Sequence, residues 1–210
     1  MSQHISGKKA LHIVMMLGGV VLSALGMALY YFSALGSDPV SVFIDGLHSC
    51  FHLSYGMVLN GFNIAVLTTV ILFARKEIGI GMVISLLFSG VLLDGWMALL
   101  NTIPVQNGIL ARVFIFALGI LSLSLGTALF LESKLGAAPW DTVLVTISKK
   151  TRISFCYIRF FSDASFTIIG YFLGGIVGIG TLLSVLTVGM LIDCFCHILA
   201  QLQEYGTHLA

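Results

Sequence analysis

Six long apolar runs limit what this chain can fold into more than any other feature of its sequence. A helix needs about 20 apolar residues to cross the hydrocarbon core of a bilayer. Only 9% of the 210 residues are charged, whereas a soluble domain carries about 25% because its surface must be solvated. So few charges cannot cover a globular surface. We therefore expect an integral membrane protein.

The runs are predicted to be helices. Backbone groups must be paired within lipid, and the runs lack the two-residue alternation of barrel strands. The first run follows Lys8 and Lys9 in the manner of a signal peptide, but it is too long for one and is kept as a span. The six predicted spans are about 10–33, 56–74, 78–100, 108–131, 154–175 and 178–200.

The basic residues predict which side of the membrane each connection faces. With six spans, nine of the ten Lys and Arg residues fall on one side, which the positive-inside rule makes cytoplasmic. Both termini are then cytoplasmic. Eight spans, with further crossings after Pro39 and Pro139, would put Arg75 and Lys76 outside, so we reject that alternative.

The two halves of the sequence repeat each other. Residues 25–39 match 125–139 at eight of fifteen positions, and 79–94 match 178–193 at eight of sixteen. The shared residues include Gly, Pro and Asp, which seldom coincide by chance. Each half holds three spans, so the second half must enter the membrane from the opposite side. This inverted arrangement is typical of many secondary transporters.

We therefore predict an all-α membrane protein in which six transmembrane helices form two inverted three-helix repeats. The first repeat covers 1–100, a linker covers 101–108, and the second repeat covers 109–210. Together they form one compact membrane domain.

Each repeat also contains a short extra helix after a Leu-Gly-x-x-Pro break, predicted over 39–50 and 139–149. Proline suits the first position of a helix, where its missing N–H is no loss. Two placements stay open. The short helices either lie along the interface, with Trp140 as an anchor, or enter the membrane and present their N-termini to an anionic group.

Two stretches of the second half, "LGAAPWDTVLVTISKKTRIS" and "GIVGIGTLLSVLTVGMLID", resemble the YczE/YyaS/YitT family of bacterial integral membrane proteins. The shared pattern is Leu-Gly-x-x-Pro-Trp-Asp, then Gly-x-Gly-Thr, then Gly-x-x-x-Asp. The first half departs from it at Val40, Ser41 and Met82. The resemblance implies a protein of the bacterial cytoplasmic membrane and does not indicate a substrate.

Polar residues in or beside the spans are the candidates for a binding site. Asp94 and Asp193 are repeat-equivalent carboxylates, and a charge inside a span usually marks a pathway. The alternative is that each caps the short helix of its own repeat. Asn63 and Asp163 are also equivalent, although Asp163 has the spacing of a helical ion pair with Arg159. The predicted substrate site comprises Pro39, Asn63, Asp94, Pro139, Trp140, Asp141, Asp163 and Asp193.

Other classes of function find little support. The stretches "HSCFH" (48–52) and "DCFCH" (193–197) contain metal-binding residue types, but neither has a full ligand set, so we predict no metal site and no cofactor. No nucleophile elbow or phosphate loop is present, and we predict no catalytic site and no enzyme. No basic cluster suits nucleic acid.

We expect a small multi-pass transporter that moves a small polar metabolite across the bacterial cytoplasmic membrane by alternating access. The alternative is a non-transporting membrane scaffold or assembly factor, which the minimal loops of this chain disfavour. The expected partners are the lipid bilayer and the transported molecule. The substrate, the coupling ion and the oligomeric state, including a homodimer, stay open.

Overall fold

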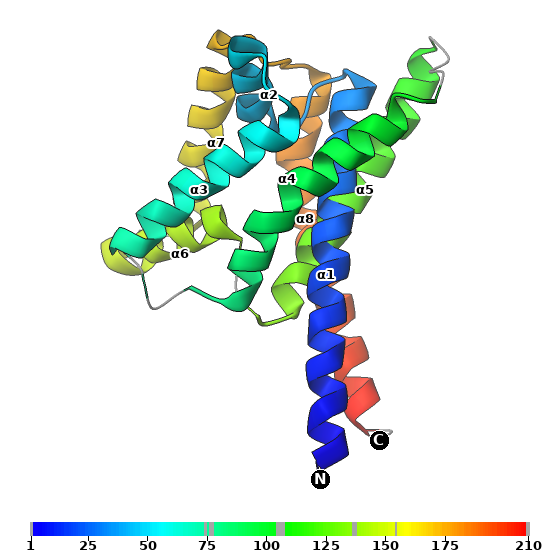
Figure 1. Cartoon of the computed structure of the whole chain (residues 1–210), viewed down its shortest axis with the longest axis vertical. Coiled ribbons are helices and arrows are strands. Elements are labelled where there is room, and N and C mark those ends of the chain that lie inside the picture. Colours follow the sequence, from blue (N-terminus) through cyan, green and yellow to red (C-terminus); the bar gives the residue numbers. More distant parts are fainter. Residues whose placement is uncertain are drawn as a thin grey trace.

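A computed structural model shows eight α-helices in the described part of the chain (Figure 1). The structure describes residues 2–73, 75, 78–103, 108–135, 138–153 and 155–208, without the side chains of 2–9, 141, 145, 155, 156 and 204–208. Residues 104–107 of the predicted linker lie outside this part. The helices are α1 (Ser2–Ser33), α2 (Pro39–Phe51), α3 (Tyr55–Phe73), α4 (Ile80–Leu100), α5 (Ile109–Glu132), α6 (Pro139–Thr151), α7 (Phe155–Phe172) and α8 (Ile179–His208).

Five helices within the described residues are long and apolar enough to cross a membrane: those in α1, α3, α4, α5 and α8. They correspond to five of the six predicted spans. The sixth predicted span is α7, which has 18 residues, includes Arg159 and Asp163, and is not among the five. The chain is therefore an all-helical membrane protein with several apolar helices.

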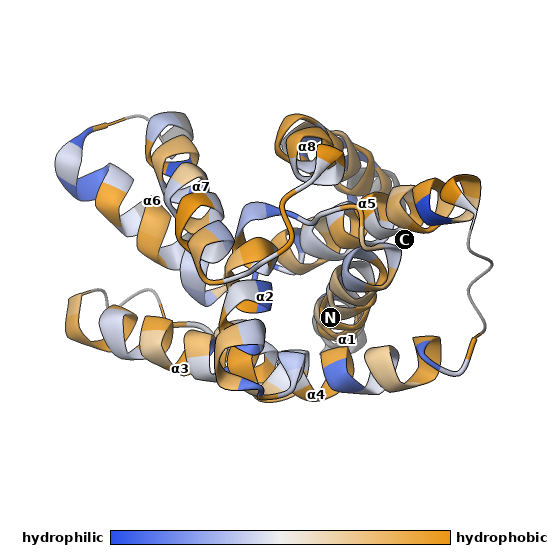
Figure 2. Cartoon of the chain, turned by 90° about the horizontal axis from the view of Figure 1, so that it is seen from above, coloured by the Kyte–Doolittle hydropathy of each residue, from blue (hydrophilic) through white to orange (hydrophobic). Residues whose placement is uncertain are grey.

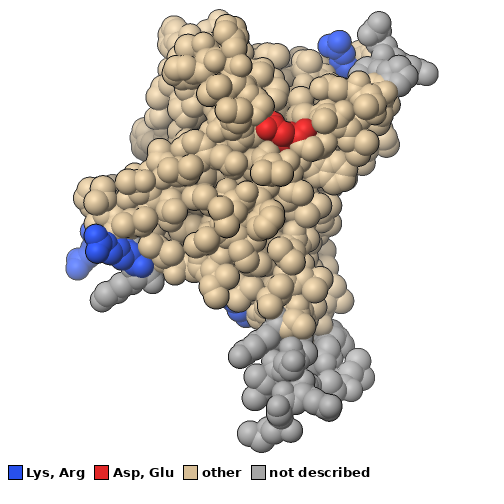
Figure 3. Space-filling view, in the orientation of Figure 1, with Lys and Arg blue, Asp and Glu red and all other residues tan. Residues whose placement is uncertain are grey.

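Large apolar side chains cover the outer surface of the molecule. Leu110 is 82% exposed and Phe172 is 81% exposed. In the space-filling view most of the visible face is uncharged, and its Lys and Arg atoms lie near the edges (Figure 3). Such a surface suits contact with lipid, which is as apolar as these side chains.

The helices form two bundles. The central bundle consists of α1, α4, α5 and α8, in which α1 packs along α5, α4 packs on α1, and α8 packs on α5. The lateral bundle consists of α2, α3, α6 and α7, in which α2 packs on α7 and α3 packs on α6. Figure 2 shows the two bundles from above. Each bundle takes corresponding helices from both halves of the sequence.

Two equivalent backbone hydrogen bonds join the halves of the chain. The N–H of Gly81, at the start of α4, donates to the carbonyl of Leu135 at 2.9 Å. The N–H of Gly180, at the start of α8, donates to the carbonyl of Leu35 at 3.0 Å. Each half thus supplies the acceptor for a helix start of the other half.

The predicted short helices are confirmed as α2 and α6, each of 13 residues with proline in its first turn. Both end at a residue in the left-handed conformation, His52 and Arg152. The first half of α2 is buried by its neighbours, and its buried residues are Pro39, Ser41, Val42, Ile44, Asp45 and Gly46. This burial shows that α2 is part of the packed interior of the protein.

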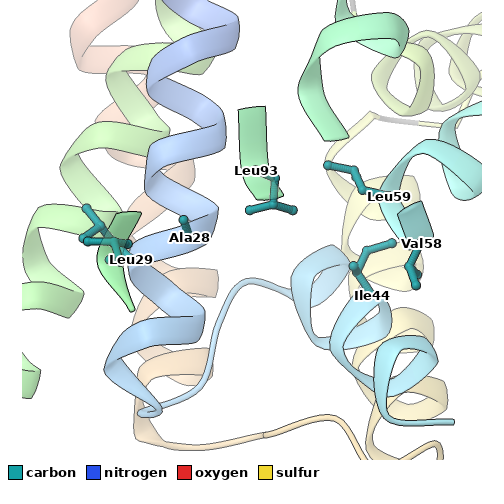
Figure 4. Close-up of a cluster of buried hydrophobic side chains, with 7 residues drawn as sticks. Ala28, Leu29, Ile44, Val58, Leu59 and Leu93 are labelled. Carbon is teal, nitrogen blue, oxygen red and sulfur yellow. The ribbon is translucent and has the colours of Figure 1, made fainter. Parts of the chain in front are cut away.

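One cluster of buried apolar side chains connects the bundles (Figure 4). Ala28 and Leu29 come from α1, and Leu93 comes from α4. Its other members come from α2, α3 and the end of α4: Ile44, Val58, Leu59 and Leu100. The first half of the chain is therefore packed across both bundles.

Glycines bring α1 and α5 into backbone contact. A Cβ atom on Gly26 would lie 2.5 Å from the backbone nitrogen of Leu123, and one on Gly126 would lie 2.5 Å from that of Ser23. Small residues allow such approaches between helices in lipid.

We predict that Gly26→Ala destabilises the protein by about 1–3 kcal/mol, the usual cost of overpacking. Gly18→Ala on the same helix is the control, because a Cβ there meets no atom within 4 Å, and alanine is the better helix former. Thermal melting of the purified protein in detergent should show a lower Tm for the first variant only. Equal Tm values for the two variants would contradict this contact.

Candidate functional site

The predicted site residues fall into three places in the structure. Asn63 and Asp94 lie between α3 and α4, Trp140 and Asp163 lie in the lateral bundle, and Asp193 lies on an exposed face of α8. Pro39 and Pro139 are buried in the first turns of α2 and α6. The side chain of Asp141 lies outside the described residues.

Polar groups hold α3 against α4. Asp94 accepts hydrogen bonds from the Ser54 hydroxyl at 2.6 Å and from the Gly56 N–H at 2.8 Å. One turn further along, Asn60 Oδ1 accepts from the Gly90 N–H at 3.2 Å. Asn63 Nδ2 donates to the Ser89 hydroxyl at 3.1 Å. We call these contacts the α3–α4 latch.

Asp94 is a capping residue, but for a different helix than the sequence suggested. It binds the first turn of α3, while α2 is capped by Asp38. The reason is geometric, since the C-terminal half of α4 lies beside the start of α3. The close approach also needs glycine, because a Cβ on Gly56 would lie 2.0 Å from the carbonyl oxygen of Gly90.

No corresponding latch joins α7 to α8 in the described residues. Gly189 is the counterpart of Gly90, and a Cβ added to it meets no atom within 4 Å. Phe160, the counterpart of Asn60, is 63% exposed. Asp193 is exposed and takes no side-chain hydrogen bond from a described residue. Figure 2 shows the ribbons of α7 and α8 running apart.

Aromatic rings fill the middle of the lateral bundle. Trp140 of α6 contacts Phe166 of α7, with ring centroids 4.8 Å apart, and Phe62 of α3, at 5.9 Å. Asp163 lies one turn from Phe166 on α7 and pairs with Arg159 at 3.2 Å. The predicted helical ion pair is therefore confirmed. Trp140 is held inside the bundle by these rings.

A small cavity lies where α1, α2, α3 and the α7–α8 connection meet. Its volume is about 20 Å³, enough for one water-sized species. It is lined by Tyr30, Tyr31, Ala34, Gly36, Ser37, Asp45, Tyr55 and Ile176. The sequence analysis proposed none of these residues. We call this the Asp45 cavity.

Asp45 is the acidic group of the cavity and is 5% exposed. Its Oδ1 accepts a hydrogen bond from the Tyr55 hydroxyl at 3.0 Å, and its Oδ2 accepts one from the Ile176 N–H at 2.7 Å. Tyr31 stacks on Tyr55 with centroids 4.2 Å apart and donates to the Ser41 carbonyl at 3.2 Å. These bonds tie α1 and the α7–α8 connection to the lateral bundle.

Asp38, in the connection before α2, places a second carboxyl group close to the cavity. Burial raises the pKa of Asp38, although its hydrogen bonds with Ser41 and the charge of Arg159 act in the opposite direction. The region around the start of α2 contains two carboxyl groups, those of Asp38 and Asp45. Within the described residues, no Lys or Arg forms an ion pair with Asp45.

A family model described as a family of unknown function (DUF6198) matches residues 10–197. Uncharacterized protein YyaS of Bacillus subtilis is 29% identical over 86% of this chain and 90% of that protein. An uncharacterized protein of Haemophilus influenzae is 27% identical over 90% of this chain and 85% of its own length. Uncharacterized membrane protein YczE of Bacillus subtilis is 26% identical over 83% and 80%. No solved structure matches.

We predict that Asp94→Ala lowers the stability of the protein by about 1–2 kcal/mol, because two hydrogen-bond donors at the start of α3 lose their acceptor. Asp193→Ala is the matched control, since its carboxylate is exposed. Thermal melting in detergent should show a fall in Tm of several degrees for the Asp94 variant and little change for the control. Equal losses for both variants would contradict the assigned contact.

Proposed function

We propose that this chain, which belongs to the family of unknown function described above (DUF6198), is a transporter built from two inverted repeats. Its membership of the family confirms the resemblance to YczE and YyaS that the sequence indicated. The proposed transporter moves a small polar metabolite across the bacterial cytoplasmic membrane, without a catalytic step. In this proposal α1, α3, α4, α5, α7 and α8 all span the membrane, and both termini are cytoplasmic.

The reciprocal bonds between the halves support an inverted repeat. Gly81 donates to Leu135, and Gly180 donates to Leu35, as expected if a two-fold axis in the membrane plane exchanges the halves. The basic residues support the orientation. The Lys150 ammonium group donates to the Phe73 carbonyl, so the end of α6 lies beside the end of α3, at the same side of the membrane.

The proposal rests on a difference between two equivalent pairs of helices. The contact between α3 and α4 is closed, and the corresponding contact between α7 and α8 is open. The α3–α4 latch joins the lateral bundle to the central bundle, and α7 and α8 lack the corresponding contact in the described residues. Alternating access between inverted repeats requires this asymmetry, because each state of such a carrier closes one of two equivalent contacts.

We assign this structure to a state that is closed on the outer side of the membrane and open on the inner side. The latch residues of α3 lie in the outer half of that helix, and their α4 partners lie between its middle and its outer end, so the outer side is closed. Phe160 lies in the inner half of α7, and Gly189 and Asp193 lie at the middle of the predicted span 178–200 and toward its inner end, so the inner side is open. In the opposite state Phe160 and Gly189 come together, and Asn63 and Ser89 separate. A polar substrate would enter beside Asp193.

The test uses two engineered cysteine pairs in a variant without native cysteines. Asn63→Cys with Ser89→Cys reports the outer contact, and Phe160→Cys with Gly189→Cys reports the inner one. We expect the outer pair to form a disulfide readily in the described state. In a variant with both pairs, one disulfide should prevent the other. Molecules that form both disulfides at once would contradict alternating access.

Transport itself is measured in proteoliposomes. Vesicles are incubated with a small-molecule extract of bacterial cells, and their lumen is examined by mass spectrometry. Protein locked by the outer disulfide is the matched control, because a reductant releases it. We expect at least one polar metabolite to accumulate only after release. Identical lumen contents before and after reduction would overturn the proposed function.

A further inference from the structure

The two elbows between a long helix and a short helix have matching features at the residues that the structure describes in both. Ala34 and Lys134 both have positive φ angles, as do His52 and Arg152. The Ser33 hydroxyl donates to the Tyr30 carbonyl, and the Ser133 hydroxyl donates to the Phe130 carbonyl. The fold of the elbow therefore depends on features that both copies have.

The polar groups around the Asp45 cavity occur in the first copy alone. At the equivalent positions the second copy replaces each tyrosine or aspartate with an apolar residue. These pairs are Tyr30/Phe130, Tyr31/Leu131, Asp38/Ala138, Asp45/Val145 and Tyr55/Phe155. The backbone features that the described residues of both elbows share therefore do not require these groups.

A buried carboxylate needs compensation for its lost hydration. Both oxygens of Asp45 accept hydrogen bonds, which is how an ionised carboxylate is bound, since it can only accept. No described Lys or Arg neutralises it. Its two partners, the Tyr55 hydroxyl and the Ile176 N–H, are neutral groups, so neither supplies a positive charge.

A second group in the cavity also lacks a partner. Tyr30 lines the cavity and is 1% exposed. Its buried hydroxyl has no hydrogen-bond partner among the described residues, although buried polar groups are nearly always bonded. The ring cannot turn away freely, because it packs against Phe116 with centroids 5.2 Å apart.

We propose that the Asp45 cavity binds one sodium ion, with the Asp45 carboxylate and the hydroxyl oxygens of its tyrosines as the groups that attract it. The volume suits a single dehydrated ion, and hard cations take oxygen ligands. The ion supplies the missing positive charge and gives the Tyr30 oxygen a partner.

The ion has a further role that rests on the proposed function. The cavity lies at the closed outer side, between Tyr31 of the central bundle and Asp45 and Tyr55 of the lateral bundle. An ion held there joins the two bundles, so its binding favours the outer-closed arrangement. Sodium is then the coupling ion of the transporter. Since the second repeat has no such site, coupling occurs at one face of the membrane only.

The test is equilibrium binding of radioactive sodium to the purified protein in detergent, with potassium, lithium and choline as competitors. We expect saturable binding that choline does not displace. Asp45→Asn should abolish it. Tyr30→Phe should weaken it about tenfold, the order expected for one lost polar contact. Tyr171→Phe is the control because this side chain is 62% exposed and does not line the cavity, and it should bind as the unaltered protein does.

Thermal melting provides a second readout that excludes misfolding. Sodium should raise the Tm of the protein relative to choline at equal ionic strength, and the Asp45 variant should lose this rise whatever its Tm in choline, which the loss of one hydrogen bond can lower. A Tm or binding response that follows pH and ignores sodium would overturn the inference, because the occupant would be a proton. Equal binding by the Asp45 variant would overturn it too.

The two proposals fail in different ways. Accumulation of a metabolite that is independent of a sodium gradient, with no sodium binding, would remove the ion site and leave transport standing. Sodium binding that is lost in Asp45→Asn, without any metabolite uptake, would support the site and contradict transport.

Discussion

The N–H groups in the first turn of a helix have no acceptor within that helix. Within a bilayer they must therefore bond to another part of the protein, and several contacts between helices in this structure meet that requirement. The starts of α4 and α8 meet it through the carbonyls of Leu135 and Leu35. The start of α3 meets it through Asp94. In all three cases the acceptor comes from a different helix or from the other half. Helix starts therefore determine which elements lie together.

The same constraint explains the short helices. Pro39 and Pro139 begin α2 and α6 without an N–H to satisfy at that position. The chain can thus turn inside the protein twice at low cost. The two turns then diverge in chemistry. The first surrounds a buried carboxylate with tyrosines, and the second puts apolar side chains at the equivalent positions. The described parts of the two turns thus share backbone features and differ in their side chains.

Glycine and polar groups act together at the contact between the bundles. Gly56 and Gly90 let α3 and α4 approach, and Asn60, Asn63 and Asp94 then find partners across the gap. Glycine alone does not bring the helices together, since Gly189 retains the small residue while α7 has Phe160 where α3 has Asn60. The contact between α3 and α4 has both features.

Much of the fold was predictable because lipid imposes simple rules. The lengths of the apolar runs, the prolines and the matched glycines predicted the long helices and the two short ones, as well as the Arg159–Asp163 pair. The sequence of α7 also explains why it is less apolar than the other long helices, because it includes Arg159 and Asp163. The predicted site residues lie in separate places in the structure. Asp94 and Asn63 prove to join α3 to α4, and the Asp45 cavity was not proposed, although comparing the two halves residue by residue would have pointed to it.

The sequence by itself thus determined the environment of the protein, the order of its helices and the correspondence of its halves, because these depend on the composition and spacing of neighbouring residues. Only the tertiary structure decided that α3 packs on α4 while α7 and α8 stand apart, and that Asp45 meets Tyr55 and the distant Ile176 N–H. Such contacts depend on how helices far apart in sequence cross, and the period of an apolar helix does not specify which neighbour its few polar groups will meet.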